Sequence, residues 1–165
     1  MKYLNDTPEE QVATKWMDEA ASVAEHALCL RSKCGSVIVK DGEIIGEGYN
    51  APPLDNLEFL TCLDEYKLPQ KFKYDRTCCV HAEERAIMDA LKKNSEKLNG
   101  SRLYFIRLDK DGAKKKAGKP CCTVCSRLAL DAGIYEFVLW HAEGICVYNM
   151  DEYNRISYQY VEGEK

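Results

Sequence analysis

The first apolar period in the chain is helical and begins close to the N-terminus. The residues Thr7-Pro8-Glu9-Glu10 have the form of a capping box with proline at the first helical position. Apolar side chains then recur every three or four residues, which is the spacing of one face of an α-helix. That face consists of Val12, Trp16, Ala20, Val23 and Ala27. The pattern predicts an amphipathic helix that starts at Pro8.

The next apolar segments are typical of strands. Ser36–Val39 and Glu43–Gly46 flank Lys40-Asp41-Gly42, whose Asp-Gly pair favours a tight hairpin turn. We expect two antiparallel strands here. An irregular stretch follows from Tyr49 to Cys79.

Helices and strands alternate in the second half of the chain. Apolar positions recur at helical spacing after His81 and again after Cys122, where Gly133 ends the pattern. The order strand, helix, strand, helix, strand predicts right-handed crossovers and a sheet covered by helices on both faces, an α/β fold. The other predicted elements are strands at Arg102–Ile106 and Tyr135–Trp140 and a final helix within Tyr148–Tyr160.

Length and composition fit this picture. A chain of 165 residues, 45% of them hydrophobic, with no long polar or repetitive tract, predicts a single domain over residues 1–165. The sequence shows no signal peptide and no run of eighteen apolar residues, which favours a cytoplasmic protein without a membrane segment. Nine cysteines, an odd number, favour reduced thiols and metal ligation over a disulfide scaffold.

Candidate chemistry gathers where the two later helices begin. His81-Ala82-Glu83 precedes one helix, and Pro120-Cys121-Cys122-Thr123-Val124-Cys125 opens the other. One imidazole and two thiolates suit zinc, and three protein ligands leave a fourth position for water, whose pKa then falls towards neutrality. Glu83 lies beside the ligands and can move protons. We predict that His81, Cys122 and Cys125 bind Zn²⁺ and that Glu83 is catalytic.

Some alternatives stay open at this motif. C-x-x-C is satisfied by Cys122 and Cys125, which share one helix face one turn apart, but spacing alone does not exclude a C-x-x-x-C choice that uses Cys121. His-x-Glu is frequent, and a lone C-x-x-C can be redox-active or part of a structural finger. The conjunction of both at two helix starts favours a catalytic metal site, because helix dipoles support thiolates there.

Other histidines and cysteines carry less information. A second His-Ala-Glu, His141-Ala142-Glu143, follows a strand-like run without a later C-x-x-C, so we interpret it as the polar end of a strand. The alternative is that Glu143 or His141 reaches into the site from a sheet edge. Cys62, Cys78 and Cys79 crowd the stretch before His81. Buried free thiols are the favoured interpretation of these three, with a second metal site as the alternative.

The order H-x-E and then P-C-x-x-C is the signature of the zinc nucleobase deaminases. The chain resembles the cytidine and deoxycytidylate deaminase superfamily, most closely its deoxycytidylate deaminase-like branch. The resemblance implies a three-layer α/β/α sandwich around a five-stranded mixed sheet, and a zinc-dependent hydrolytic deaminase that works as a homo-oligomer. The segments that carry it are Cys29–Gly42, Gly46–Pro53, Val80–Glu83 and the cysteine helix with its end at Asp131–Ile134.

The same resemblance implies roles for two residues that contact substrate. Asn50 is expected to hydrogen-bond the sugar or the base, although an ordinary turn residue before Pro52-Pro53 is an equal alternative. Ala82 is expected to offer its backbone to the base. Two departures limit the transfer. The deoxycytidylate branch commonly has Asn-Ala where this chain has Arg85-Ala86, so no substrate-orienting role is carried over to position 85, and Cys121 is an extra residue between Pro120 and Cys122.

The substrate expected first is deoxycytidine monophosphate (dCMP), a small molecule. Candidate cations for its phosphate are Arg31 and Lys33, Arg76, and the lysine loop Lys110–Lys119. For the lysine loop, a solvated loop is the favoured interpretation and phosphate binding the alternative. Alternatives are a deaminase of cytosine, cytidine or guanine, a tRNA adenosine deaminase, and a non-catalytic zinc-binding protein, in which Glu83 would be unnecessary. The net charge of −4 makes nucleic acid an unfavourable partner.

Overall fold

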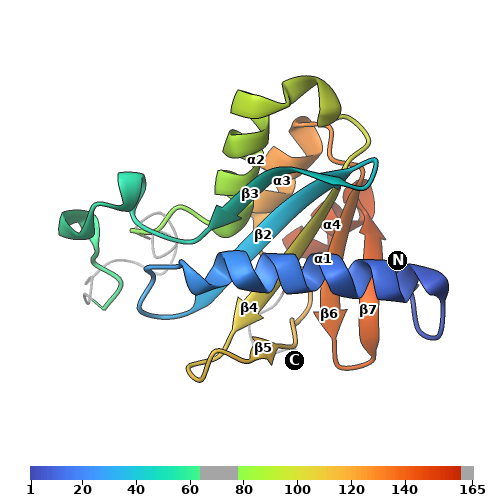
Figure 1. Ribbon diagram of the computed structural model, residues 1–165, viewed down its shortest axis with the longest axis horizontal. Helices are drawn as coiled ribbons and strands as arrows, with labels where there is room; N and C mark the ends of the chain where they lie inside the picture. The colour runs from blue at the N-terminus through green and yellow to red at the C-terminus, as the bar shows by residue number, and fades with distance from the viewer. Residues whose placement is uncertain (64–77, 161–165) are drawn as a thin grey trace.

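The computed structural model describes residues 1–63 and 78–160, and its centre is one mixed sheet (Figure 1). The strands are β1 (Lys2–Tyr3), β2 (Lys33–Lys40), β3 (Glu43–Tyr49), β4 (Arg102–Leu108), β5 (Lys114–Lys115), β6 (Glu136–His141) and β7 (Gly144–Asn149). Their order is β1-β7-β6-β4-β2-β3, with β5 paired to β4. β4 and β6 run parallel, and the other pairs are antiparallel. Four of the longer strands lie at the predicted positions, β7 makes up the five that the family resemblance implies, and the two-residue strands β1 and β5 extend the sheet to seven.

Helices cover both faces of this sheet, as the alternation of elements predicts. α1 crosses one face, and α2, α3 and α4 cover the other, which gives three layers (Figure 1). Within the described ranges, no helix is both long and apolar enough to span a membrane. The α-helices are α1 (Pro8–Glu25), α2 (Ala82–Lys93), α3 (Thr123–Asp131) and α4 (Met150–Tyr158), and short 3₁₀ turns occur at η1 (Pro53–Asp55), η2 (Leu57–Phe59) and η5 (Ser95–Lys97).

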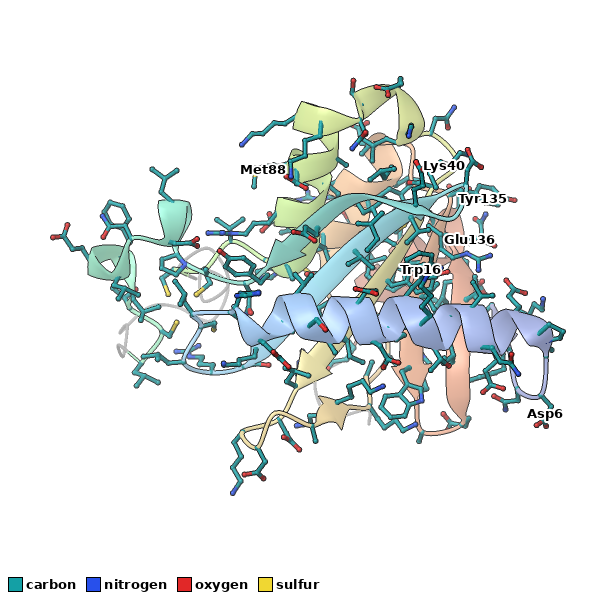
Figure 2. The ribbon with its side chains drawn as sticks, in the orientation of Figure 1. Asp6, Trp16, Lys40, Met88, Tyr135 and Glu136 are labelled. Atoms are coloured by element: carbon teal, nitrogen blue, oxygen red, sulfur yellow. The ribbon has the colours of Figure 1, made fainter. Side chains whose placement is uncertain are left out.

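Helix α1 starts at Pro8 as predicted, but its buried face is rotated from the predicted one. Trp16 and Ala20 pack on the sheet, and Figure 2 labels Trp16 where α1 crosses the sheet. Val12, expected on this face, is 53% exposed. The face that is buried consists of Ala13, Trp16, Met17, Ala20 and Ala24.

The two hydrogen bonds of the predicted capping box at α1 are not formed. The Thr7 hydroxyl donates to the Leu4 carbonyl at 2.6 Å and does not cap the helix. The Glu10 carboxylate accepts from the Asp6 N–H at 2.9 Å, one residue earlier than the capping box requires. The helix start is therefore fixed by Pro8 and the preceding turn.

The hairpin between β2 and β3 confirms the Asp-Gly prediction. Asp41 and Gly42 form a two-residue turn with φ values of 51° and 78°, the conformation that matches the twist of antiparallel strands. β2 then pairs with β4 on its other side, which places the hairpin within the sheet.

Two glycines on β3 determine how closely α2 approaches the sheet. A Cβ at Gly48 would collide with the backbone of Ala82 and Ala86, and a Cβ at Gly46 would lie 2.5 Å from the Ala86 carbonyl oxygen. Only hydrogen fits in this space. The two glycines therefore fix where α2 begins, and with it the position of His81.

The last part of the chain contains one strand that was not predicted. The final helix is α4, inside the predicted range, and β7 lies directly before it. The turn between β6 and β7 is formed by the second His-Ala-Glu. His141 is buried there, with its Nε2 2.7 Å from the Tyr148 hydroxyl and its Nδ1 3.1 Å from the Ala117 carbonyl oxygen.

Candidate active site

Both halves of the metal motif lie at helix N-termini, which confirms the predicted helix starts. His81 is the N-cap residue of α2, and Cys122 is the N-cap residue of α3. The Glu84 carboxylate accepts from the His81 N–H at 2.9 Å and fixes the first turn of α2. The Cys122 sulfur accepts from the Cys125 N–H at 3.4 Å. The positive ends of two helix dipoles therefore meet at this point.

Three ligand atoms converge between these helix starts. The His81 Nδ1 lies 3.1 Å from the Cys125 sulfur and 3.4 Å from the Cys122 sulfur, and the two sulfurs are 3.0 Å apart. Sulfurs around tetrahedral zinc are about 3.8 Å apart, since each Zn–S bond is about 2.3 Å long. The ligand atoms of His81, Cys122 and Cys125 would therefore have to move apart by less than about 1 Å to make room for the ion. Cys121 is exposed and does not belong to this group.

The charges of the three side chains favour metal binding. A hydrogen bond with the Cys125 thiol, together with the nearby His81, lowers the pKa of Cys122 to about 4. The contact with Cys122 in turn raises the pKa of His81 to about 9. Sharing its proton with Cys122 raises the pKa of Cys125. A divalent cation would displace the protons held by His81 and Cys125, because only the deprotonated forms are ligands.

Glu83 lies beside this group without being one of its ligands. Its side chain is almost fully enclosed, with 6% of the residue exposed. Burial is the main cause that raises the pKa of Glu83 to about 7, and the negative charge of Cys122 adds to it. A carboxyl group with a pKa near neutrality both takes and gives a proton at physiological pH.

A pocket of about 270 Å³ opens above Glu83. His81, Ala82, Glu83, Cys122 and Asn50 line it, so the structure brings together most of the residues predicted for the site. Among the lining residues that sequence reasoning missed are Cys34, Phe105, Arg107, Leu139 and Tyr153.

Arg107 was the one residue among these with a usable sequence signal. It is the residue directly after the predicted strand Arg102–Ile106, and charged side chains at strand ends often have functional roles. The others are apolar or aromatic side chains that carry no such signal.

Asn50 has both a structural contact and a position in the pocket. Its Oδ1 accepts from the Cys34 N–H at 2.8 Å, and its Nδ2 donates to the Ser32 carbonyl at 2.8 Å. These bonds fix the orientation of the amide. One N–H of the side-chain amide is left for a molecule in the pocket, since the NH₂ group has two donors.

Arg85 lies outside this pocket and has a structural role. Its guanidinium donates to the Pro52 carbonyl at 2.7 Å, forms an ion pair with Asp55 at 2.9 Å, and lies over the Tyr49 ring. Tyr49 also donates to Asp55 at 2.6 Å. Arg85 thereby holds the chain after β3, which includes Asn50, against α2.

The remaining cations that were predicted to bind phosphate do not all lie at the pocket above Glu83. Arg31 and Lys33 line a neighbouring hollow of about 750 Å³, not the pocket above Glu83. In the lysine loop, Lys114 pairs with Asp18, while Lys119 lines the pocket. Arg76 lies outside the described residues. Neither His141 nor Glu143 lines the pocket, in keeping with their interpretation as a strand end.

A buried carboxylate next to a His-Cys-Cys ligand set, at two helix starts in an α/β/α sandwich, defines the class of zinc-dependent hydrolases that move protons with a glutamate. Residues 10–154 match the family described as the cytidine and deoxycytidylate deaminase zinc-binding region, and the chain belongs to this family. The protein is therefore a hydrolase of C–N bonds with Zn²⁺ as its cofactor.

Individual relatives agree with this assignment. The chain is 32% identical over 125 residues to the deoxycytidylate deaminase of Mycobacterium phage D29, covering 72% of this chain and 86% of the relative. A crystal structure of dCMP deaminase from cyanophage S-TIM5 in complex with dCMP and dUMP is 22% identical, with a TM-score of 0.53 over 79% of this chain and 80% of that one. Cytidine deaminase from Burkholderia pseudomallei is 17% identical, with a TM-score of 0.56 over 85% and 94%. Both structures show the same fold.

Proposed function

We propose that the protein deaminates deoxycytidine monophosphate, giving deoxyuridine monophosphate and ammonia. The observation that carries this proposal is the buried Glu83 in a pocket whose wall is formed by His81 and Cys122. The relative from phage D29, named deoxycytidylate deaminase, supports the choice of substrate.

The chain's own residues account for the proton transfers of this reaction. His81, Cys122 and Cys125 would hold the ion, and zinc when bound supplies a Lewis acid that lowers the pKa of water to near neutrality. Glu83 takes a proton from the attacking water and delivers it to the ring nitrogen beside the reacting carbon, and then takes the second proton of the same oxygen and gives it to the departing amine. The bond from the ring carbon to the amine breaks, ammonia leaves, and the oxygen of the water stays as the carbonyl oxygen.

Two neighbours of Glu83 are suited to orient the base. The backbone of Ala82 belongs to the first turn of α2, where N–H groups lack partners within the helix. The remaining N–H of Asn50 faces the same pocket. Both contacts would act on the substrate before the proton transfers begin.

Arg107 is our candidate for contact with the phosphate. It lines both the pocket above Glu83 and the neighbouring hollow, and so does Ser32. Arg31 and Lys33 line the hollow too, so a phosphate at this boundary would lie among several cations. Guanidinium groups bind phosphate through two parallel hydrogen bonds, which favours Arg107 over a lysine.

The test is an ammonia-release panel with dCMP, deoxycytidine, cytidine, cytosine, guanine and an adenosine-containing tRNA stem-loop. We expect the highest kcat/KM for dCMP. Arg107→Gln should lower kcat/KM for dCMP by about 10-fold to 100-fold and leave deoxycytidine nearly unchanged, since a hydrogen bond to a charged group contributes about 1.5–3 kcal/mol.

Two outcomes would contradict this proposal. Equal rates on dCMP and deoxycytidine would show that the phosphate contributes no binding energy. Activity on guanine or the stem-loop alone would assign the protein to a different branch of the family, with Glu83 in the same role.

We also propose a homo-oligomer in a reducing compartment, the cytoplasm. The homo-oligomer comes from the family resemblance, and light scattering coupled to size-exclusion chromatography would show a mass above the 18.8 kDa of one chain. All nine cysteines are free in the structure, as expected where thiols stay reduced.

A further inference from the structure

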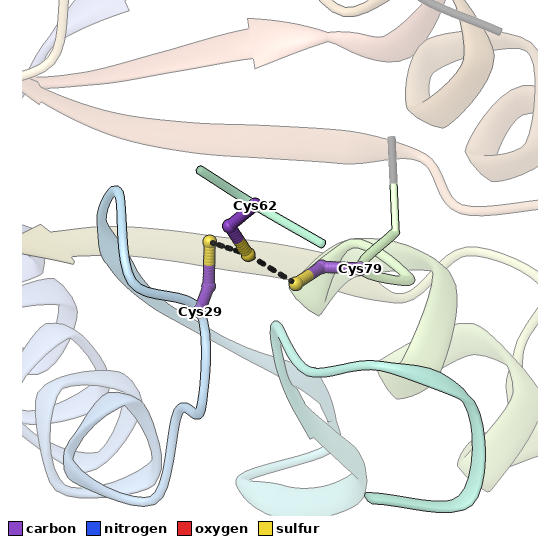
Figure 3. A group of neighbouring side chains, drawn as sticks. All are labelled: Cys29, Cys62 and Cys79. Atoms are coloured by element: carbon purple, nitrogen blue, oxygen red, sulfur yellow. Dashed lines mark hydrogen bonds between the residues drawn. The ribbon is translucent and has the colours of Figure 1, made fainter. Parts of the chain in front are cut away.

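The cysteines that crowd the stretch before α2 lie apart from the catalytic pocket. Cys62 is buried, as expected, whereas Cys78 and Cys79, expected to be buried too, are half-buried. The sulfurs of Cys62 and Cys79 point towards that of Cys29 (Figure 3). None of these four residues lines the pocket above Glu83.

The second His-Ala-Glu, in contrast, is connected to a wall of this pocket. His141 is the last residue of β6 and is 7% exposed. Its Nδ1 lies 3.1 Å from the carbonyl oxygen of Ala117. Ala117, Gly118 and Lys119, which we call the loop wall, line the pocket above Glu83. His141 itself does not line the pocket, so any effect on the substrate must pass through this contact.

Ala117 is the residue through which the loop wall packs on the body of the protein. Residues 116–122 form no helix or strand, and from residue 109 to residue 119 only Ala117 is not exposed. Its side chain packs against the core between the sheet and α2. Its N–H donates to the Trp140 carbonyl at 2.8 Å, and its carbonyl faces the His141 ring. The last two residues of β6 therefore hold both backbone groups of Ala117, and the second bond depends on a side chain.

The two neighbours of the imidazole determine its tautomer. A carbonyl oxygen only accepts, so the Nδ1 of His141 carries the proton that the Ala117 carbonyl accepts. In the neutral ring Nε2 is then an acceptor, and the Tyr148 hydroxyl donates to it at 2.7 Å. Burial raises the pKa of Tyr148, so this hydroxyl keeps the proton that it donates. Tyr148 thus orients His141 with its N–H directed at the loop wall.

We propose that His141 is a positioning residue for the substrate pocket, because its Nδ1–H holds Ala117 and with it the loop wall. The proposal rests on the proposed function, in which the pocket above Glu83 binds the base of dCMP. The loop wall lies beside the substrate both before and during the reaction. Its displacement therefore weakens binding of the ground state and the transition state alike, which raises KM and leaves kcat nearly unchanged.

Two substitutions of His141 separate its two hydrogen bonds. The amide of asparagine branches at Cγ, where histidine carries Nδ1, so His141→Asn keeps a donor for the Ala117 carbonyl. The amide of glutamine branches one atom further out, at the level of Nε2. His141→Gln therefore keeps an acceptor for the Tyr148 hydroxyl and loses the bond to Ala117.

The first test compares the steady-state kinetics of these two variants with dCMP. We expect His141→Gln to raise KM about 3-fold to 10-fold, the contribution of one neutral hydrogen bond, and to change kcat less than about 2-fold. His141→Asn should restore KM to within about 2-fold of the wild-type value. Val147→Ala is the matched control, because Val147 is buried in the adjacent strand β7 but packs towards α1. It should lower the melting temperature and keep KM. Equal KM values for His141→Gln and wild type, or an equal rise in all three variants, would overturn the proposal.

The second test needs no substrate and is therefore independent of the proposed function. Amide hydrogen exchange of the zinc-loaded enzyme, followed by mass spectrometry, should be faster in residues 116–119 of His141→Gln than in wild type or His141→Asn. If His141→Gln fails to fold, Tyr148→Phe takes its place, because without the hydroxyl the ring is free to adopt the other tautomer. Unchanged exchange would refute the anchor itself. Faster exchange with unchanged KM would show that the loop wall does not act on the substrate and would refute the positioning role.

Discussion

Glu83 owes its chemistry to its surroundings more than to its residue type. The side chain is buried at the first turn of α2, next to Cys122, and both features make its charged form less favourable. An exposed glutamate would stay ionised at neutral pH and would be a poor proton donor. The same carboxyl group, placed here, is suited to take and to give a proton at neutral pH.

Replacement of Glu83 by glutamine tests this role. Glu83→Gln should keep the fold and the zinc content but lower kcat by about 10²-fold to 10⁴-fold, because the proton carrier is lost while the ligands stay. Steady-state ammonia release, zinc analysis and circular dichroism measure the three quantities. A variant that kept more than about a tenth of the activity would assign the proton transfers to another group.

A second residue-scale prediction separates Cys121 from its neighbours. Cys122→Ser and Cys125→Ser should each lose the catalytic zinc ion, whereas Cys121→Ser should retain it, because only the first two sulfurs lie against His81. Zinc content of the three purified variants is the measurement. Loss in Cys121→Ser with retention in Cys122→Ser would shift the ligand assignment by one residue.

At the scale of elements, the site depends on how closely α2 lies to β3. Ala82 at the start of α2 and Gly48 near the end of β3 touch without any intervening side chain. A wider separation would move His81 and Glu83 together away from Cys122. Packing at the sheet therefore sets the distance between the two halves of the site.

Insertion of one methyl group at this contact should be costly. Gly48→Ala should lower the free energy of unfolding by about 1–3 kcal/mol, the usual effect of overpacking, and thermal denaturation of the zinc-loaded protein would show it. Gly118→Ala is the matched control, since nothing lies within 4 Å of its added Cβ. Equal melting temperatures for Gly48→Ala and wild type would mean that α2 shifts freely on β3.

Several elements could be predicted from the sequence because their signals are local. The starts of α2 and α3 follow from periodic apolar positions, and the β2–β3 turn follows from Asp41-Gly42. The buried face of α1 could not be predicted from the sequence. The apolar residues in line with Val12 and those in line with Ala13 both recur at helical spacing, so either set could have formed the buried face. Gly35 on β2 decides between them, as it admits the backbone of α1 at Ala20 and Ala24.

The parts that escaped prediction depend on contacts between distant residues. β7 is buried on both faces, so its sequence shows no alternation of apolar and polar residues to identify a strand. Arg107 joins the pocket only because β2 and β4 are neighbours. Cys29 joins Cys62 from 33 residues away. The catalytic ligand set was accessible from sequence because its motif is contiguous at each helix start.

At the scale of the whole molecule, the net charge favours a small-molecule substrate over a nucleic acid. A charge of −4 opposes the approach of nucleic acid, whose affinity depends on the release of counterions by basic side chains. We expect no retention of a labelled tRNA stem-loop at about 50 mM salt, measured by fluorescence anisotropy. Binding that weakened steeply towards about 200 mM salt would instead favour a tRNA deaminase.

The distance along the chain between the two halves of the catalytic site has a consequence for the order of folding. His81 and Cys122 are 41 residues apart, whereas the β2–β3 hairpin closes through two residues. Short loops close at lower entropic cost, so the hairpin is expected to form before α3 joins α2 across the longer connection. A chain at the earlier stage offers zinc at most two of its three catalytic ligands together, the cysteine pair of α3. Capture of the catalytic ion thus marks the completion of folding, and the enzyme gains its chemistry only when the two helix starts have met.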